Sequence, residues 1–156
     1  MKQPDRRHDV SFPFSWHFLQ NGWKLLFFSE GPFLPSHGRG APWNRGAYLV
    51  AALAHCGECH TPRNWFGATE ESRFLAGNPD GPDGKKVPNI TPDKKTGIGE
   101  WSEDDILGVL KDGRTPDGDK VGGAMAEVVK STARLTDEDR RAIALFLKSV
   151  PPISSR

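Results

Sequence analysis

The chain has 156 residues, which suits one domain of ordinary size with an appendage and is too short for two full domains. Its formal charge of +1, from 21 basic and 20 acidic residues, gives no basic footprint and argues against nucleic-acid binding. The 17 glycines and 13 prolines predict a loop-rich fold, which a buried cofactor could organise.

Residues 1–42 are predicted to form an extension and a linker. Residues 1–10 are polar and the apolar stretch after them is interrupted by polar side chains, so we expect neither a signal-peptide core nor a membrane span. Aromatic and aliphatic residues at near-helical spacing predict a short helix over 15–28. Glycine and proline residues predict a linker over 31–42. We therefore expect one domain, in residues 43–153, preceded by an aromatic helical extension.

The domain is predicted to begin with a helix and to continue with a long loop. Asn44 is a plausible helix cap, and the helix is expected to run from about Arg45 to His55. Residues 61–100 lack a sustained apolar period and are rich in turn signals, so this stretch is predicted to be mostly loop. A loop of this length usually wraps something.

Two further helices have clear start signals in the sequence. Ser102 with Asp105 forms a capping pattern, and Gly113 is expected to close that helix. Thr136 begins a last helix, predicted over 137–148. No strand is predicted, so the fold class is all-α. The residues of the last helix that we expect to face inward are Ile143, Leu145, Phe146 and Leu147.

The segment His55-Cys56-Gly57-Glu58-Cys59-His60 contains the pattern C-x-x-C-H. Its spacing lets two thiols add to the two vinyl groups of a haem while the adjacent imidazole meets the iron. The chain has only two cysteines, so this motif predicts one covalently attached haem c. A thioredoxin-like redox pair would follow a strand in a βαβ unit, and a structural zinc site needs four ligands; neither pattern surrounds these cysteines.

Met125 is the predicted sixth ligand of the iron. Apart from Met1 it is the only methionine, and it follows two glycines, 122 and 123, in an expected turn from which it can approach the opposite face of the ring. The alternative is a methionine that fills a gap in the core. His55 is a rival ligand, but it lies too close to Cys56 to reach the far face.

Several polar residues are candidates for supporting the haem. A carbonyl between Pro88 and Thr91 could accept the Nδ1 proton of His60, and Arg63, Asn89 or Trp101 could meet a propionate. Ordinary packing is the alternative for each of them.

Four sequence blocks together resemble a known family: NRGAYLV from Asn44, HCGECHTPRN from His55, PNITPDKKTGIGEWSEDD from Pro88, and GGAM at 122–125. The chain is similar to the multihaem cytochrome c subunits of membrane-associated bacterial alcohol, gluconate and sorbitol dehydrogenases, over about residues 43–152. The resemblance implies a class I cytochrome c fold, with Cys56, Cys59, His60 and Met125 as the haem residues. Residues 12–33 resemble the segment that follows the first haem module in two-haem members.

The resemblance implies an electron carrier and not an enzyme. We expect the chain to pass electrons from a dehydrogenase toward the respiratory chain, in the periplasm or at the periplasmic face of the inner membrane, since bacteria attach haem c outside the cytoplasm. The expected partners are a dehydrogenase and other redox proteins, with residues 16–28 docking on another haem subunit or a membrane surface. The alternatives are a haem oxidoreductase with a displaceable sixth ligand and a haem-dependent interaction subunit.

Overall fold

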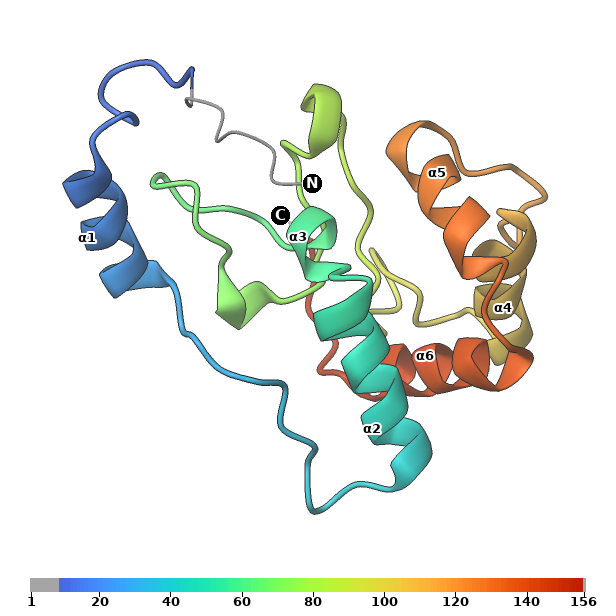
Figure 1. Cartoon of the computed structure of the whole chain (residues 1–156). Helices are drawn as coiled ribbons and strands as arrows, with labels where there is room; N and C mark the ends of the chain where they lie inside the picture. Colours follow the sequence, from blue (N-terminus) through green and yellow to red (C-terminus); the bar gives the residue numbers. More distant parts are fainter. Residues whose placement is uncertain (1–8, 156) are drawn as a thin grey trace, which may run out of the picture. The chain divides into compact units, whose positions relative to one another are not determined.

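The computed structural model describes residues 9–155, except the side chain of Asp83, and divides at Pro32 into two units. The first unit contains helix α1, His17–Phe27, as the sequence predicts (Figure 1). Its polar residues His17, Gln20, Asn21 and Lys24 share one side, and the aromatic and leucine side chains occupy the rest of the circumference. In residues 9–155 no helix combines the length and the apolar character that a bilayer crossing requires. The prediction about an export signal falls largely on residues 1–8, outside the described part.

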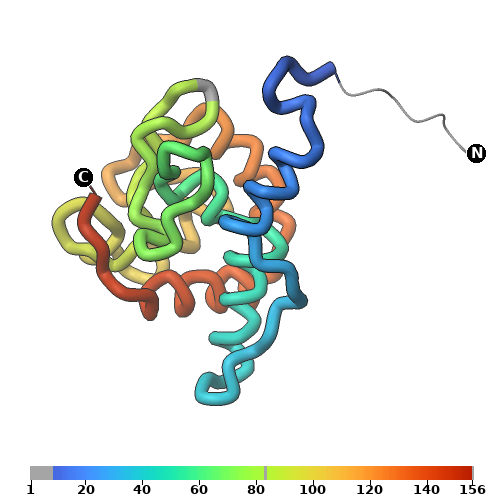
Figure 2. Tube along the Cα trace, turned by 90° about the vertical axis from the view of Figure 1, so that its left-hand side faces the viewer, coloured from blue at the N-terminus to red at the C-terminus, as the bar shows by residue number. Residues whose placement is uncertain are grey.

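The second unit is all-α, which confirms the predicted fold class. Within residues 33–155 only isolated bridging pairs occur and no strand. Helix α6, Asp137–Ser149, lies across helix α2, Ala41–Tyr48, and packs beside α4, Glu103–Asp112, while α4 also contacts α5, Gly123–Thr132 (Figures 1 and 2). The buried core that joins these elements consists of Ala47, Leu49, Val50, Leu75, Ile98, Ile106, Leu110, Ile143, Ala144, Phe146 and Leu147.

Helices α2 and α6 approach closely because Gly46 lies at their crossing. A Cβ at this position would collide with the carbonyl oxygen of Ala142. The rings of Trp43 and Phe146 pack in an edge-to-face arrangement with their centroids 5.2 Å apart. The Trp43 indole N–H donates to Ser149 Oγ at 2.6 Å. Apolar contact and this hydrogen bond both contribute to the crossing.

The start of α2 corrects one prediction. Asn44 is not a cap, because the helix begins at Ala41 with Pro42 in its first turn, a position that suits proline. The Asn44 side chain instead ties down the preceding segment: its amide donates to the carbonyls of Ser36, Arg39 and Gly40, and its oxygen accepts the Ser36 N–H.

Helix α2 runs directly into a π-helical turn, Leu49–Leu53, in which the Ala54 N–H donates to the Leu49 carbonyl. One extra residue is thus accommodated just before the C-x-x-C-H motif. The sequence predicted one regular helix to His55, and the chain instead leaves the helical path at His55, whose φ of 38° is left-handed.

The later helices follow their sequence signals with two exceptions. Ser102 and Asp105 form a capping box, Gly113 closes α4 at a φ of 68°, and Thr136 accepts the Asp139 N–H at the start of α6. Leu145 was predicted to face inward, and this is wrong, because the residue lies on the outer side of α6 and is 46% exposed. Helix α5 is the other exception: it forms where a glycine-rich turn was expected.

The long connection 61–101 is mostly loop, as predicted, with two 3-10 turns, Glu71–Arg73 and Pro82–Gly84. The buried Asn89 organises it, since its amide donates to Thr96 Oγ1 and to the carbonyl of Ile153. Thr91 Oγ1 adds a bond to the same carbonyl. The C-terminal segment therefore lies beside this loop, as Figure 2 shows.

Candidate functional site

The C-x-x-C-H motif forms a single helical turn, α3, Gly57–His60, with Cys56 at its start. Residues three and four apart lie on the same face of a helix, so Cys56 presents its side chain beside those of Cys59 and His60. The His60 N–H donates to the Cys56 carbonyl at 2.9 Å and closes this turn. Both thiols are half-buried and neither forms a disulfide. One short face thus carries two reactive sulfurs and an imidazole.

Gly57 is required by space and not by an unusual φ. A Cβ at this position would lie 2.6 Å from Cε2 of Phe74, whose ring packs against the core. Any side chain here would push the Phe74 ring aside and disturb the turn that carries the motif.

His60 is held in one tautomer by the backbone. Its ring is buried, and Nδ1 lies 2.8 Å from the Pro88 carbonyl, which can only accept, so Nδ1 carries the proton. This confirms the predicted acceptor between Pro88 and Thr91. Burial lowers the pKa of His60, against the opposing effect of the Pro88 bond, and keeps the imidazole neutral. Nε2, which has no partner among residues 9–155, is left with the lone pair that a metal needs.

The backbone around His60 is anchored to the same loop. The His60 carbonyl accepts the Gly77 N–H at 2.7 Å, and the buried Thr61 accepts the Leu75 N–H through Oγ1 at 3.1 Å. Side chain and main chain of the motif are therefore both fixed by residues 75–88.

The thiol of Cys56 lies in a low-polarity environment. Burial raises the pKa of Cys56 to about 11, so the free thiol is protonated at neutral pH. Catalytic C-x-x-C pairs have the opposite property, a lowered pKa that makes a thiolate. The site therefore differs from a disulfide-exchange centre. Within the described residues, no group of three or more His, Cys, Asp or Glu side chains is arranged to hold a metal ion.

Met125 lies in the first turn of α5, half-buried, rather than in the turn that the sequence predicted. The helix begins at Gly123, directly after Gly122, and Gly123 has a φ of 58° that favours glycine. Figure 1 shows α3 and α5 as separate elements on different sides of the second unit. Met125 is thus carried by a different part of the fold from the motif. His55, the rival ligand, is exposed.

The three candidate propionate partners have other contacts. Arg63 donates to Glu58 Oε2 of α3 at 2.8 Å and to the Gly67 carbonyl of its own loop at 2.7 Å. Asn89 uses its amide group inside the 89–96 loop and on the C-terminal segment. Trp101 packs partly buried against the core.

The donor set fits a covalently held haem. Two half-buried thiols, one neutral imidazole with a free Nε2 and a thioether on a separate helix match the groups that attach and ligate haem c. A core of aliphatic and aromatic side chains adjoins the motif.

Sequence reasoning missed one buried charge, Arg140. The signal for it was present: Arg140 stands three, four and seven residues before Ile143, Ala144 and Leu147, on the apolar side of α6. A basic residue in such a stripe is buried only if it is paired.

Residues 44–151 match the family profile described as Cytochrome c. A protein named diheme cytochrome c-type, from Cereibacter sphaeroides, is 52% identical over 96% of this chain and 49% of its own length. The fructose dehydrogenase cytochrome subunit of Gluconobacter japonicus is 42% identical over 95% of this chain and 30% of its own length. The alcohol dehydrogenase (quinone) cytochrome c subunit of Gluconacetobacter polyoxogenes is 42% identical over 97% of this chain and 34% of its own length.

The chain therefore spans half or less of the length of these relatives. Because each match takes in at least 95% of this chain, the matches include helix α1 as well as the second unit.

Proposed function

The chain belongs to the cytochrome c family, and from that premise we propose that it is an electron carrier with one covalent haem c. It takes electrons from a dehydrogenase and passes them toward the respiratory chain. The observation that carries the proposal is the one-turn helix α3, on which two thiols and a neutral imidazole share one face. The count of one haem rests on the two cysteines of the whole sequence.

Four residues would hold the haem. Cys56 and Cys59 would form the two thioether links, and His60 Nε2 and the sulfur of Met125 would bind the iron. The bound haem supplies a one-electron change at its iron. The Pro88 carbonyl keeps the proton on Nδ1 of His60 and fixes the direction of Nε2, so the ligand needs no proton transfer during function. Burial of His60 excludes water from this side.

The proposed electron donor is a dehydrogenase subunit, and the proposed location is the periplasmic face of the inner membrane. Two of the relatives are named as cytochrome subunits of fructose and alcohol dehydrogenases, which supports a donor of this class.

Helix α1 is the proposed docking element for that donor. Its apolar side is exposed, with Leu25 at 85% and Leu26 at 74%, and aromatic side chains surround them. The longer relatives retain this segment together with the haem unit, which is expected of a contact surface that serves electron transfer. Large aromatic side chains are the usual anchors of such interfaces.

Replacement of the proposed sixth ligand tests the haem site directly. In Met125→Ala we expect the near-infrared sulfur-to-iron band of the ferric protein to disappear, the reduction potential to fall, and carbon monoxide to bind the reduced protein. The reason is that thioether sulfur favours ferrous iron and closes the sixth position. Mass spectrometry under denaturing conditions should still find one haem on the chain.

Val128→Ala is the matched control, because Val128 is exposed on the same helix. It should leave the band, the potential and the single haem adduct unchanged. A band that survives Met125→Ala contradicts the ligand assignment. Rapid binding of carbon monoxide to the reduced unmodified protein would instead support an oxidoreductase with a displaceable ligand.

A further inference from the structure

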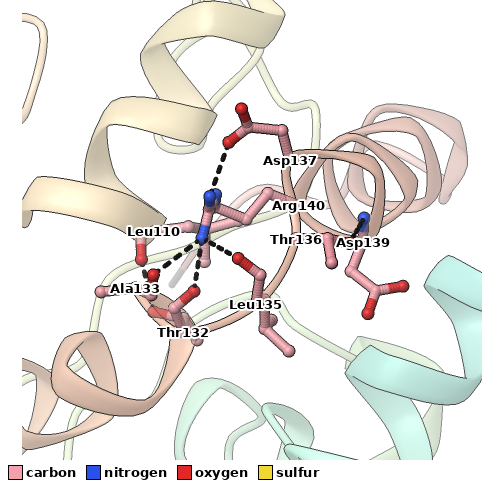
Figure 3. A network of polar contacts seen from close by, with 8 residues as sticks. All are labelled: Leu110, Thr132, Ala133, Leu135, Thr136, Asp137, Asp139 and Arg140. Atoms are coloured by element: carbon pink, nitrogen blue, oxygen red, sulfur yellow. Dashed lines mark hydrogen bonds and ion pairs between the residues drawn. The ribbon is translucent and has the colours of Figure 1, made fainter.

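Arg140 of α6 is a buried cation that binds the C-terminal end of helix α5. Only 4% of the residue is exposed. Its Nη1 donates to three carbonyls, those of Thr132 at 2.9 Å, Ala133 at 3.1 Å and Leu135 at 2.6 Å, and Nη2 donates to Asp137 Oδ1 at 2.6 Å (Figure 3). One guanidinium thus joins the start of α6 to the chain that precedes it.

The three carbonyls lie at the C-terminal end of α5 and in the turn after it. The last carbonyls of a helix have no partner within the helix, and a cation near them is favoured by the helix dipole. Arg140 therefore closes the C-terminal end of α5 from α6. Thr132 makes a second link from the same end, since its Oγ1 donates to the Leu110 carbonyl of α4 at 2.5 Å.

Helix α5 contacts α4, and its most buried residue lies at its C-terminal end. Thr132 is the one residue of this ten-residue helix that is buried. The opposite end starts at Gly123, in a left-handed conformation, after Gly122, which provides no side-chain cap. The position of α5 therefore depends strongly on its C-terminal end, where Arg140 and Thr132 act.

The clamped end and Met125 share one face of α5. Met125 precedes Thr132 by seven residues, which is close to two helical turns, or about 10 Å along the axis. Val129 lies between them on the same face. A rotation or tilt of α5 at Thr132 would consequently move the sulfur of Met125.

We propose that Arg140 is a positioning residue for Met125: by holding the C-terminal end of α5, it sets where the thioether sulfur stands. This inference rests on the proposed function, in which Met125 is an axial ligand. Arg140 has no contact with the motif among the described hydrogen bonds and acts only through α5.

Arg140 also contributes to the stability of the fold. Its Nε is buried without a partner among the described residues, and such a group costs free energy. Arg140→Met would remove that cost, but it would leave the carbonyls of Thr132, Ala133 and Leu135 without this donor, and loss of one partner of a buried pair is destabilising. A purely structural role predicts that Arg140→Met moves the loss of the sulfur-to-iron band and the loss of helix equally along the denaturant axis. A positioning role predicts that the band is lost before the helix by a wider margin.

The test uses the full haem-loaded chain with three variants. Arg140→Met removes the hydrogen bonds to the C-terminal end of α5, and Arg140→Lys keeps a charge that can reach some of the carbonyls. Arg141→Met is the control, because Arg141 is exposed and, within residues 9–155, forms its hydrogen bond with Glu103. Denaturant titrations follow the sulfur-to-iron band and the far-ultraviolet helix signal in parallel, and carbon monoxide binding reports the open sixth position.

In Arg140→Met the band should be lost at a lower denaturant concentration than in the unmodified protein, and the gap between this loss and the helix transition should widen. The fraction open to carbon monoxide should rise about tenfold, which corresponds to about 1.4 kcal/mol. Arg140→Lys should widen the gap by an intermediate amount, and Arg141→Met should leave the gap unchanged. Thr132→Val, which removes the bond to α4, should widen the gap as well.

The proposal is overturned if the gap between the two transitions is unchanged in Arg140→Met, or if Arg141→Met widens the gap equally. Should Arg140→Met not accumulate, Arg140→Lys decides by the same criterion. A band that persists in Met125→Ala would contradict the ligand assignment itself, which separates failure of the proposed function from failure of this inference.

Discussion

Asp139 is an ionised carboxylate that joins two helices. It accepts two hydrogen bonds from Arg45 of α2, Nε to Oδ1 at 2.7 Å and Nη2 to Oδ2 at 2.8 Å. The bonds from Arg45 hold the pKa of Asp139 below its ordinary value of 3.8, against the smaller effect of burial. A lowered pKa means that this stabilisation is present above about pH 4 and is lost as the pH falls through the pKa of the folded state.

We therefore expect Asp139→Asn to lower the free energy of unfolding at pH 7 and to have little effect at pH values below that of the folded-state pKa. Denaturant titrations of the two proteins at a series of pH values measure the difference. Glu138→Gln is the control, since Glu138 is exposed one position earlier. A difference that stays constant down to the lowest pH would show that the ionised Asp139 contributes nothing through its charge.

Individual contacts were predictable where one residue type had few options. The carbonyl that accepts from His60 was expected between Pro88 and Thr91, and it is that of Pro88. The pairing of Arg140 with three carbonyls could not be predicted, because these partners are backbone atoms and carry no sequence signal. For the same reason Asn44, expected as a cap, binds the preceding loop instead.

At the scale of the elements, the crossing of α2 and α6 depends on one missing side chain. At Gly46 a Cβ would collide with the Ala142 carbonyl and approach Cβ of Phe146 to 2.9 Å. Gly46→Ala should therefore destabilise the protein, by about 1–3 kcal/mol as overpacking usually does. The free energy of unfolding from denaturant titration gives the value.

Gly108→Ala in α4 is the matched control with the opposite expectation. Its Cβ would meet nothing closer than the Arg114 carbonyl at 3.5 Å, which is an ordinary contact. Alanine should stabilise this helix interior by up to about 1 kcal/mol. Equal losses in the two variants would refute the close approach as the reason for Gly46.

Elements were predictable where their signals are local. Helices α4 and α6 begin at Ser102 and Thr136 with side-chain caps, and both carry apolar stripes, so one short window identifies each of them. Helix α5 has no side-chain cap and starts after two glycines, which in a short window indicate a turn. Its position is determined by contacts at Thr132, far from its start.

At the scale of the whole molecule, the units meet in sequence at Pro32 and Phe33, ten residues before the domain boundary predicted at position 43. Phe33 belongs to the second unit because its ring packs against that of Tyr48, with the ring centroids 5.6 Å apart. The class of the fold and the family were predictable because the motif and the helix signals agree.

The two sides of α1 allow a test of docking. Leu26→Lys places a charge on the apolar side, and Asn21→Lys places the same charge on the polar side. We expect Leu26→Lys to slow electron uptake from the proposed dehydrogenase donor by about tenfold or more, since loss of one anchor costs more than about 1 kcal/mol. Asn21→Lys should behave as the unmodified protein.

The haem spectrum and the reduction potential should be unchanged in both α1 variants, because α1 lies outside the unit that carries the motif. Stopped-flow measurement of haem reduction gives the rate. If Leu26→Lys reduces haem content or alters the spectrum, α1 serves the haem unit itself and the docking proposal fails.

The π-helical turn at Leu49–Leu53 adds a rotation between α2 and the motif. A helix advances about 100° per residue, so a single surplus residue turns the residues after it by that angle relative to a regular helix. The direction in which the chain reaches His55 and Cys56 is therefore not fixed by the side of α2 that packs on α6. Deletion of Ala52 would remove this rotation and turn the Cys56 thiol in a new direction, with every side chain of the motif still present.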